Sequence, residues 1–134
     1  MIDVVIIDKS DQIKFETSRV KAKIQAFSDE VKGLNVIEQG SSAVVLLHYN
    51  VREEQTAEYI GLILKVGSQS KVVVVADKLS EECVLNCLLA GAQGYQQLDQ
   101  LGGYADRLVT VIDAGEAWIS RRMTATLLDA LRQQ

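Results

Sequence analysis

The chain is poor in several residue types, and each shortage excludes a class of protein. Its 134 residues include no proline, one histidine and two cysteines. Two cysteines are too few for a disulfide framework, so a reducing cytoplasm is the expected location. No apolar run approaches the roughly 18 residues of a membrane-spanning helix, and the opening residues MIDVVIID lack a secretory signal. We therefore expect one soluble, cytoplasmic domain that does not enter a membrane.

Charge and motif content narrow the function further. The net charge of -4 argues against direct contact with a nucleic acid backbone, which requires a clustered basic surface. Arg121 and Arg122 are expected to be solvated charges. No G-x-G-x-x-G or Walker pattern occurs, and the loop DKSDQIK lacks the glycines and hydroxyls of a phosphate-binding loop. A flavin-binding or small-molecule-binding flavodoxin-like protein is thus the less favoured alternative, and we predict no cofactor.

Three apolar runs predict the centre of a sheet. They read DVVIID near the start, AVVLLHYN at 43–50 and KVVVVAD at 71–77. Valine and isoleucine runs of this length are typical of strands that are buried on both faces of a parallel sheet. A further strand is predicted around 94–98. The run at 43–50 is unusual because it ends in His48, the only histidine of the chain.

Segments with helical period separate these strands. The stretch from 10 to 42 is ambiguous, because Ile13 to Phe27 also fits one long helix. We predict a helix to about Val20, a strand near Ala22 to Phe27, and a helix carrying Val31, Leu34 and Ile37. Four later helices are predicted. The first spans 53–66 with Ala57, Ile60 and Leu64 on one face, and the second lies between Ser80 and Gly91 with Val84, Cys87 and Leu88 inward. The third ends before Gly115 and carries Leu108, Val109 and Ile112, and the fourth follows Ser120 and carries Leu127, Leu128 and Leu131. Alternating strands and helices predict an α/β fold with a parallel sheet and right-handed crossovers.

Two motifs in the second half carry a family resemblance. The stretch AGAQGYQQLD, followed by AGEAWISRRMTATLL, resembles a response-regulator receiver (CheY-like) domain of the LuxR/NarL type. The resemblance covers about residues 2–120. It implies a flavodoxin-like three-layer α/β/α fold with a five-stranded parallel sheet in the order 2-1-3-4-5. It also implies a receiver-like domain at 1–118 and a linker helix at 119–134, which leads in that family to a helix-turn-helix domain that this chain does not contain.

The same resemblance implies a phosphoryl-transfer pocket, and most of its residues are replaced. A working receiver uses an acidic pair that holds magnesium, an aspartate nucleophile, a hydroxyl and a lysine. The matching positions here are Asp8 with Lys9 for the acidic pair, His48 for the nucleophile, Ala76 for the hydroxyl and Leu98 for the lysine. The usual Met-Pro-Gly turn after the nucleophile reads Val51, Arg52, Glu53. We therefore predict a degenerate pocket without catalytic or metal-binding residues: a pseudo-receiver that is not an enzyme.

Three interpretations of His48 stay open. It could be hydrogen-bonded to Asp8, it could bind a metal together with Asp8 and Asp77, or it could titrate as a pH switch. The hydrogen bond to Asp8 is the favoured one. Cys83 and Cys87, one helical turn apart, are expected to pack as small apolar groups.

Tyr95 falls at the position of the family's switch aromatic. With Ala76 in place of the hydroxyl, we expect the Tyr95 ring to stay in one rotamer and to fix the face made by the fourth helix, the fifth strand and the fifth helix. The alternative is a core aromatic with its hydroxyl at the surface.

The predicted function is a phosphorylation-independent regulatory and protein-interaction module of a LuxR-type transcriptional regulator in two-component signalling. A stand-alone adaptor in signalling is the alternative. A homodimer is expected, paired through the first and fifth helices or through the fourth-helix face. A fused DNA-binding domain beyond Gln134 would be its second partner.

Overall fold

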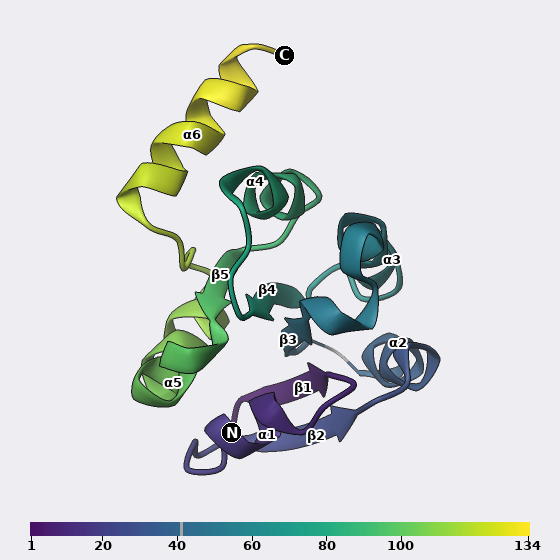
Figure 1. Cartoon of the computed structure of the whole chain (residues 1–134). Helices are drawn as coiled ribbons and strands as arrows, with labels where there is room; N and C mark the ends of the chain where they lie inside the picture. The colour runs from purple at the N-terminus through teal and green to yellow at the C-terminus, as the bar shows by residue number, and fades with distance from the viewer. Residues whose placement is uncertain (41) are drawn as a thin grey trace.

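The computed structural model describes residues 1–40 and 42–134 and shows a three-layer α/β/α fold (Figure 1). The five strands are β1 (Asp3–Ile7), β2 (Lys23–Phe27), β3 (Val44–His48), β4 (Lys71–Ala76) and β5 (Gly94–Gln97). All neighbouring strands are parallel, and their order is β2-β1-β3-β4-β5. Both the predicted fold class and the predicted strand order are therefore confirmed.

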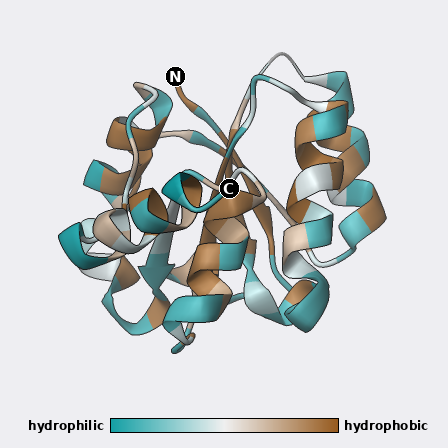
Figure 2. Ribbon diagram, turned by 90° about the horizontal axis from the view of Figure 1, so that it is seen from above, coloured by the Kyte–Doolittle hydropathy of each residue, from teal (hydrophilic) through white to brown (hydrophobic). Residues whose placement is uncertain are grey.

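Helices cover both faces of the sheet. They are α1 (Gln12–Glu16), α2 (Glu30–Gln39), α3 (Thr56–Val66), α4 (Glu81–Leu89), α5 (Leu98–Asp113) and α6 (Arg121–Arg132), with two short 3-10 turns, η1 (Tyr49–Val51) and η2 (Glu53–Gln55). Alternate residues of each strand face opposite layers, so β3 sends Val44 and Leu46 towards α1 and α5, and Val45 and Leu47 towards α2, α3 and α4. The apolar sheet between amphipathic helices is visible in Figure 2.

The predicted helix boundaries hold in the second half of the chain. The Ser80 and Ser120 hydroxyls accept hydrogen bonds from the backbone N–H groups of Cys83 and Met123, at 3.2 and 3.0 Å, as N-caps do. Gly91 has a φ of 116° and follows α4 in the left-handed conformation that favours glycine. Val84, Cys87 and Leu88 are buried as predicted.

Three predictions of local structure need correction. The first helix ends at Glu16, not near Val20, because the backbone then passes into tight turns, in which the Ser18 N–H donates to the Phe15 carbonyl at 3.3 Å and the Val20 N–H to the Thr17 carbonyl at 3.0 Å. The helix predicted from residue 53 begins as η2, and α3 starts only at Thr56. Leu98 is the first residue of α5 and lies outside β5.

Some predicted apolar positions lie at the surface instead of in the core. Val31 is 59% exposed on α2, and Leu128 and Leu131 are 46% and 49% exposed on α6. In the part of the chain that the structure describes, no helix combines the length and the apolar character that crossing a membrane requires.

Candidate functional site: the carboxyl edge of the sheet

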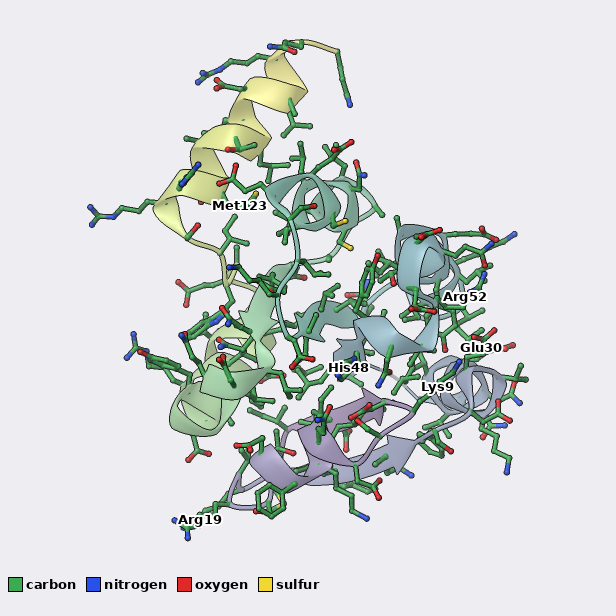
Figure 3. The ribbon with its side chains drawn as sticks, in the orientation of Figure 1. Lys9, Arg19, Glu30, His48, Arg52 and Met123 are labelled. Atoms are coloured by element: carbon green, nitrogen blue, oxygen red, sulfur yellow. The ribbon has the colours of Figure 1, made fainter. Side chains whose placement is uncertain are left out.

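The predicted pocket residues meet at one edge of the sheet. Asp8 directly follows β1, His48 ends β3, Ala76 ends β4, and Leu98 follows β5. The carboxyl ends of parallel strands share an edge, which is where open α/β sheets bind ligands. Figure 3 labels Lys9 and His48 at this edge. The sequence therefore predicted that these residues lie near one another, but it did not predict which hydrogen bonds they form.

Asp8 is the one carboxylate of the predicted pocket, and its oxygens are occupied by protein donors. It is only 4% exposed. Its Oδ1 accepts hydrogen bonds from the Ser10 backbone N–H at 2.8 Å, from the Ser10 hydroxyl at 2.7 Å and from the Asn50 Nδ2 at 3.1 Å. Its Oδ2 accepts one from the Ile13 backbone N–H at 3.1 Å. Oδ1 thus accepts three of the four hydrogen bonds and Oδ2 accepts one, so protein donors contact both oxygens of the carboxylate.

Asn50 is the member of this network that sequence reasoning missed. Its side-chain Nδ2 donates to Asp8, and its Oδ1 accepts from the Lys9 backbone N–H at 3.3 Å. Its own backbone N–H donates to the Nδ1 of His48 at 2.9 Å. One amide thus joins the loop after β1 to the turn after β3. The only signal in the sequence was an asparagine two residues after a strand end, a common place for side-chain-to-backbone hydrogen bonding.

His48 is buried and does not contact Asp8 through a hydrogen bond. It is 6% exposed, and its Nδ1 acts as an acceptor for Asn50. A neutral imidazole with an accepting Nδ1 carries its proton on Nε2. The Nε2 atom is buried without a hydrogen-bond partner among the described residues. The favoured prediction of a His48–Asp8 hydrogen bond is wrong, because the local donors of Ser10, Ile13 and Asn50 take the carboxylate.

The donor set at this edge does not fit a magnesium ion. Magnesium requires free oxygen ligands, usually carboxylates, in octahedral geometry. The Asp8 oxygens are occupied, Lys9 brings an ammonium to the loop, and His48 offers no free acceptor nitrogen. Over residues 1–40 and 42–134, no group of three or more His, Cys, Asp or Glu side chains is placed to hold a metal ion. That geometry also gives no support to a metal held by His48, Asp8 and Asp77.

The chain matches many solved structures, although its sequence comparisons found no match. No protein-family model and no curated protein sequence matches it. The LuxR-family two-component response regulator of Aurantimonas sp. SI85-9A1 matches with a TM-score of 0.76 over 98% of each chain, at 13% identity. The receiver domain of a putative response regulator NarL from Mycobacterium tuberculosis matches at 0.71 over 86% of this chain and 98% of that one, at 16% identity. This chain has the fold of a response-regulator receiver domain.

A third similar structure is an atypical orphan response regulator with a phosphorylation-independent regulatory mechanism. It matches with a TM-score of 0.62 over 81% of this chain and 96% of that chain, at 14% identity. At these identities the similarity establishes the receiver fold, and the chemistry of the site has to be argued from its own residues.

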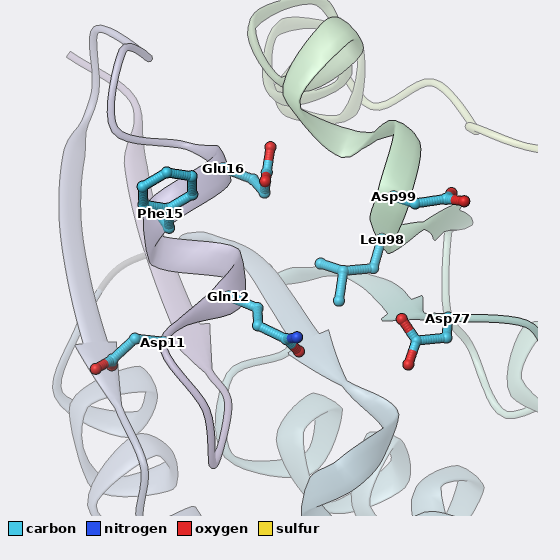
Figure 4. A pocket seen from close by; sticks show the side chains of 7 residues that line it. All are labelled: Asp11, Gln12, Phe15, Glu16, Asp77, Leu98 and Asp99. Atoms are coloured by element: carbon cyan, nitrogen blue, oxygen red, sulfur yellow. The ribbon is translucent and has the colours of Figure 1, made fainter.

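A hollow of about 430 Å³ lies next to the carboxyl edge of the sheet, between α1 and the start of α5 (Figure 4). Carboxylates supply much of its wall, since Asp11, Glu16, Asp77 and Asp99 line it together with Gln12, Phe15 and Leu98. Leu98 is 5% exposed and packs in the core under α5. An apolar side chain thus occupies the place at which the resemblance implies a lysine, and no cation balances these acids from that position.

The turn after β3 has a different construction from the predicted family turn. Arg52 forms ion pairs with Glu30 at 3.3 Å and with Glu58 at 3.6 Å, and its guanidinium lies 5.5 Å from the Tyr59 ring centre. Figure 3 shows Arg52 and Glu30 side by side. The Tyr59 hydroxyl donates to the Glu30 carbonyl at 2.6 Å, and burial raises the pKa of Tyr59. This cluster holds α2 against the turn that precedes α3.

Tyr95 lies under the C-terminal segment of the chain. It is half-buried and lines a hollow of about 260 Å³ together with Val84, Ile119 and Met123. Burial raises the pKa of its hydroxyl. Met123 of α6 is 8% exposed and packs into the core cluster beside α4, as Figure 3 shows. The predicted switch aromatic is therefore covered, and the rotamer prediction stays a prediction.

The C-terminal segment is fixed to the sheet before α6 begins. The Trp118 backbone N–H donates to the Gln93 carbonyl at 2.9 Å, and the Tyr95 N–H donates to the Trp118 carbonyl at 3.1 Å. The Trp118 indole N–H donates to the Gln96 side chain at 2.9 Å. A single parallel bridge between Gly94 and Trp118 results. The helix α6 then reaches α4, where Arg122 forms an ion pair with Glu81 at 2.6 Å.

The two cysteines lie on α4. Cys87 is buried and Cys83 is half-buried, and neither is in a disulfide. Burial, with a smaller contribution from Cys83, raises the pKa of the Cys87 thiol to about 11. Cys87 is thus a neutral, apolar core group at neutral pH, as predicted.

Proposed function

We propose that this receiver-fold chain is a regulatory and protein-interaction module that works without phosphorylation. The observation that carries the proposal is the occupied state of Asp8: its carboxylate is buried and accepts four hydrogen bonds from Ser10, Ile13 and Asn50. A cation would have to displace these donors or share Oδ2 with the Ile13 N–H, and Lys9 supplies no second carboxylate to help hold it.

The other pocket positions support the same conclusion. His48 stands where the nucleophile would be, and its Nδ1 is already the acceptor for Asn50. Ala76 has no hydroxyl to follow a phosphoryl group, and Leu98 brings no charge to neutralise one. A phosphoryl group would also enter an edge that four carboxylates border, where like charges repel it. The atypical orphan response regulator described above supports the proposal by example, because that protein combines this fold with a phosphorylation-independent mechanism.

The test is direct phosphoryl transfer. The full chain is incubated with acetyl phosphate and magnesium chloride, and its intact mass is measured. We expect no mass increase, because no carboxylate nucleophile and no cation site are available. A variant that restores an acid at the nucleophile and cation positions, Lys9→Asp with His48→Asp, serves as the matched comparison. Stoichiometric addition of one phosphoryl group to the wild-type chain would contradict the proposal.

The surface formed by α1 and α5 supports a homodimer as the partner arrangement. Phe15 is 76% exposed there, and it borders a hollow of about 430 Å³ that Arg19, Gly102 and Asp106 also line. Within residues 1–40 and 42–134, neither Arg19 nor Asp106 is in an ion pair. Across a two-fold axis, Arg19 of one copy can meet Asp106 of the other while Phe15 fills the hollow. The alternative pairing surface on α4 is covered by α6.

A charged side chain at the centre of this surface should separate the two copies. We expect Phe15→Asp to sediment as a monomer and the wild type to sediment as a dimer, because the variant places a carboxylate where the apolar contact forms. Val31→Asp, at an apolar position of α2 that is 59% exposed, is the control and should leave the dimer intact. A monomeric wild type, or a dimeric Phe15→Asp variant, would exclude this interface.

The wider assignment follows from the resemblance to LuxR-type regulators. In that arrangement α6 would connect this module to a helix-turn-helix domain, and the module would position that domain on DNA in a transcriptional regulator. A stand-alone adaptor is the alternative. The coding sequence that follows Gln134 distinguishes the two, since a helix-turn-helix supports the regulator and a stop codon supports the adaptor.

A further inference from the structure

We infer that the side-chain amide of Asn50 takes over the mechanical role of a divalent cation at this edge of the sheet. A cation bound to Asp8 and to groups after β3 would tie the two loops together through shared ligands. Asn50 ties the same two loops through hydrogen bonds. The inference goes beyond the proposed function, which concerns the missing phosphoryl chemistry and leaves open what holds the pocket together.

The contacts of Asn50 reach across the sheet edge from the turn after β3. Its Nδ2 donates to Asp8, which lies 42 positions away in sequence, and its Oδ1 accepts from the Lys9 N–H. The backbone of Asn50 is held in place as well, because its N–H donates to the Nδ1 of His48. Both ends of the amide are used on the loop after β1. A contact between two loops so far apart in sequence holds their relative position, as a shared metal ion would.

The chemistry of the neighbours explains why an amide fits where a cation does not. Asp8 accepts three hydrogen bonds from Ser10 and Ile13, and the Asn50 amide adds a fourth donor that carries no charge. Lys9 presents a backbone N–H that needs an acceptor. An amide supplies a donor and an acceptor in one planar group, whereas a cation supplies neither. On this inference the network keeps the pocket assembled in a buffer without divalent ions.

A single substitution tests the inference by exchanging the amide for a ligand that requires a cation. Asn50→Asp removes the donor to Asp8 and places two carboxylates against each other. In EDTA we expect its melting temperature to fall by on the order of 5 °C or more, because two like charges meet at a buried contact. Magnesium or calcium chloride should restore most of that loss, because two adjacent carboxylates form an oxygen site for a divalent cation.

Two further variants serve as controls for the Asn50→Asp measurement. Asn50→Leu loses both side-chain hydrogen bonds, the one to Asp8 and the one from the Lys9 N–H. It should melt at a lower temperature than the wild type, and divalent cations should not restore its stability. Asn35→Asp, an exposed asparagine on α2, should melt like the wild type with and without cations. The wild type itself should show no change on addition of magnesium.

Three results would overturn the inference. They are a wild-type melting temperature for Asn50→Leu, an Asn50→Asp variant that divalent cations fail to rescue, and a wild type that magnesium stabilises. Each of them is independent of the mass measurement with acetyl phosphate, which tests the proposed function alone.

Discussion

At the scale of single residues, Glu53 shows what the altered turn after β3 costs. Its φ is 49°, in the left-handed region, and it is the only non-glycine residue with a positive φ among those described. The family resemblance places a glycine at this position. The turn therefore keeps a conformation that suits glycine while it carries a glutamate, at a cost on the order of 1 kcal/mol or more.

Replacing this residue with glycine should stabilise the protein. We expect Glu53→Gly to raise the free energy of unfolding by about 0.5–1 kcal/mol in urea denaturation, because relief of the left-handed strain exceeds the added chain entropy. The neighbouring substitution Glu54→Gly is the control, since Glu54 lies in η2 without a positive φ. It should lower stability by about 0.5–1 kcal/mol. Equal effects of the two substitutions would exclude strain at Glu53.

The sequence predicted which residues form the site better than it predicted their contacts. The family resemblance grouped Asp8, His48, Ala76 and Leu98, and the ends of three apolar runs placed the first three of them at one edge of the sheet. The partner of His48 could not be predicted, because the donors that reach Asp8 come from irregular loops that carry no periodic signal. Asn50 was missed for the same reason.

At the scale of elements, the edge of β5 decides where the C-terminal helix lies. Gly94 lets the backbone of Trp118 approach closely: a Cβ at position 94 would lie 2.6 Å from the Trp118 carbonyl oxygen. The helix that follows then places Met123 against α4. Glycine at this strand position thus has a packing reason.

A methyl group at position 94 should release this segment. We expect Gly94→Ala to lose about 1–3 kcal/mol of stability, because the added Cβ overlaps backbone that cannot shift without breaking the Tyr95–Trp118 hydrogen bond. Trp118 is the only tryptophan, so its fluorescence emission should move to longer wavelength as it becomes solvated. Gly61→Ala is the control: nothing lies within 4 Å of its Cβ, and a mid-helix alanine should stabilise α3 by about 0.5–1 kcal/mol. Unchanged emission in Gly94→Ala would contradict this description of the edge.

Element boundaries were predictable where a cap marks them and unreliable where none does. Ser80, Gly91 and Ser120 mark their helix ends with hydrogen bonds or a positive φ. The end of α1 carries no such mark, because the backbone passes after Thr17 into tight turns that no periodicity foretells. The exposed apolar stripe of α6 also went unpredicted, because the sequence shows that a helix is amphipathic but not how much of its apolar face the domain covers.

At the scale of the whole molecule, a receiver fold surrounds the edge at which Asp8, His48 and Asn50 meet. The sheet order, the two core layers and the strand-end geometry are those of a receiver. Under the proposed function, a hydrogen-bonded network centred on Asp8 and Asn50 stands where a working receiver would hold a cation and a phosphoryl group. Such a scaffold can present surfaces to partners without a chemical trigger, which is the central claim of the proposed function.

The most direct measurement of that claim is an amide NMR titration of the full chain, labelled with nitrogen-15, with magnesium chloride and then with acetyl phosphate. The claim predicts that the backbone amide signals of Lys9, Ser10 and Asn50 keep their positions throughout both additions, because neither reagent finds a ligand at this edge. A saturable shift of those signals on addition of magnesium, followed by a second shift with acetyl phosphate, would show a working receiver and contradict the account.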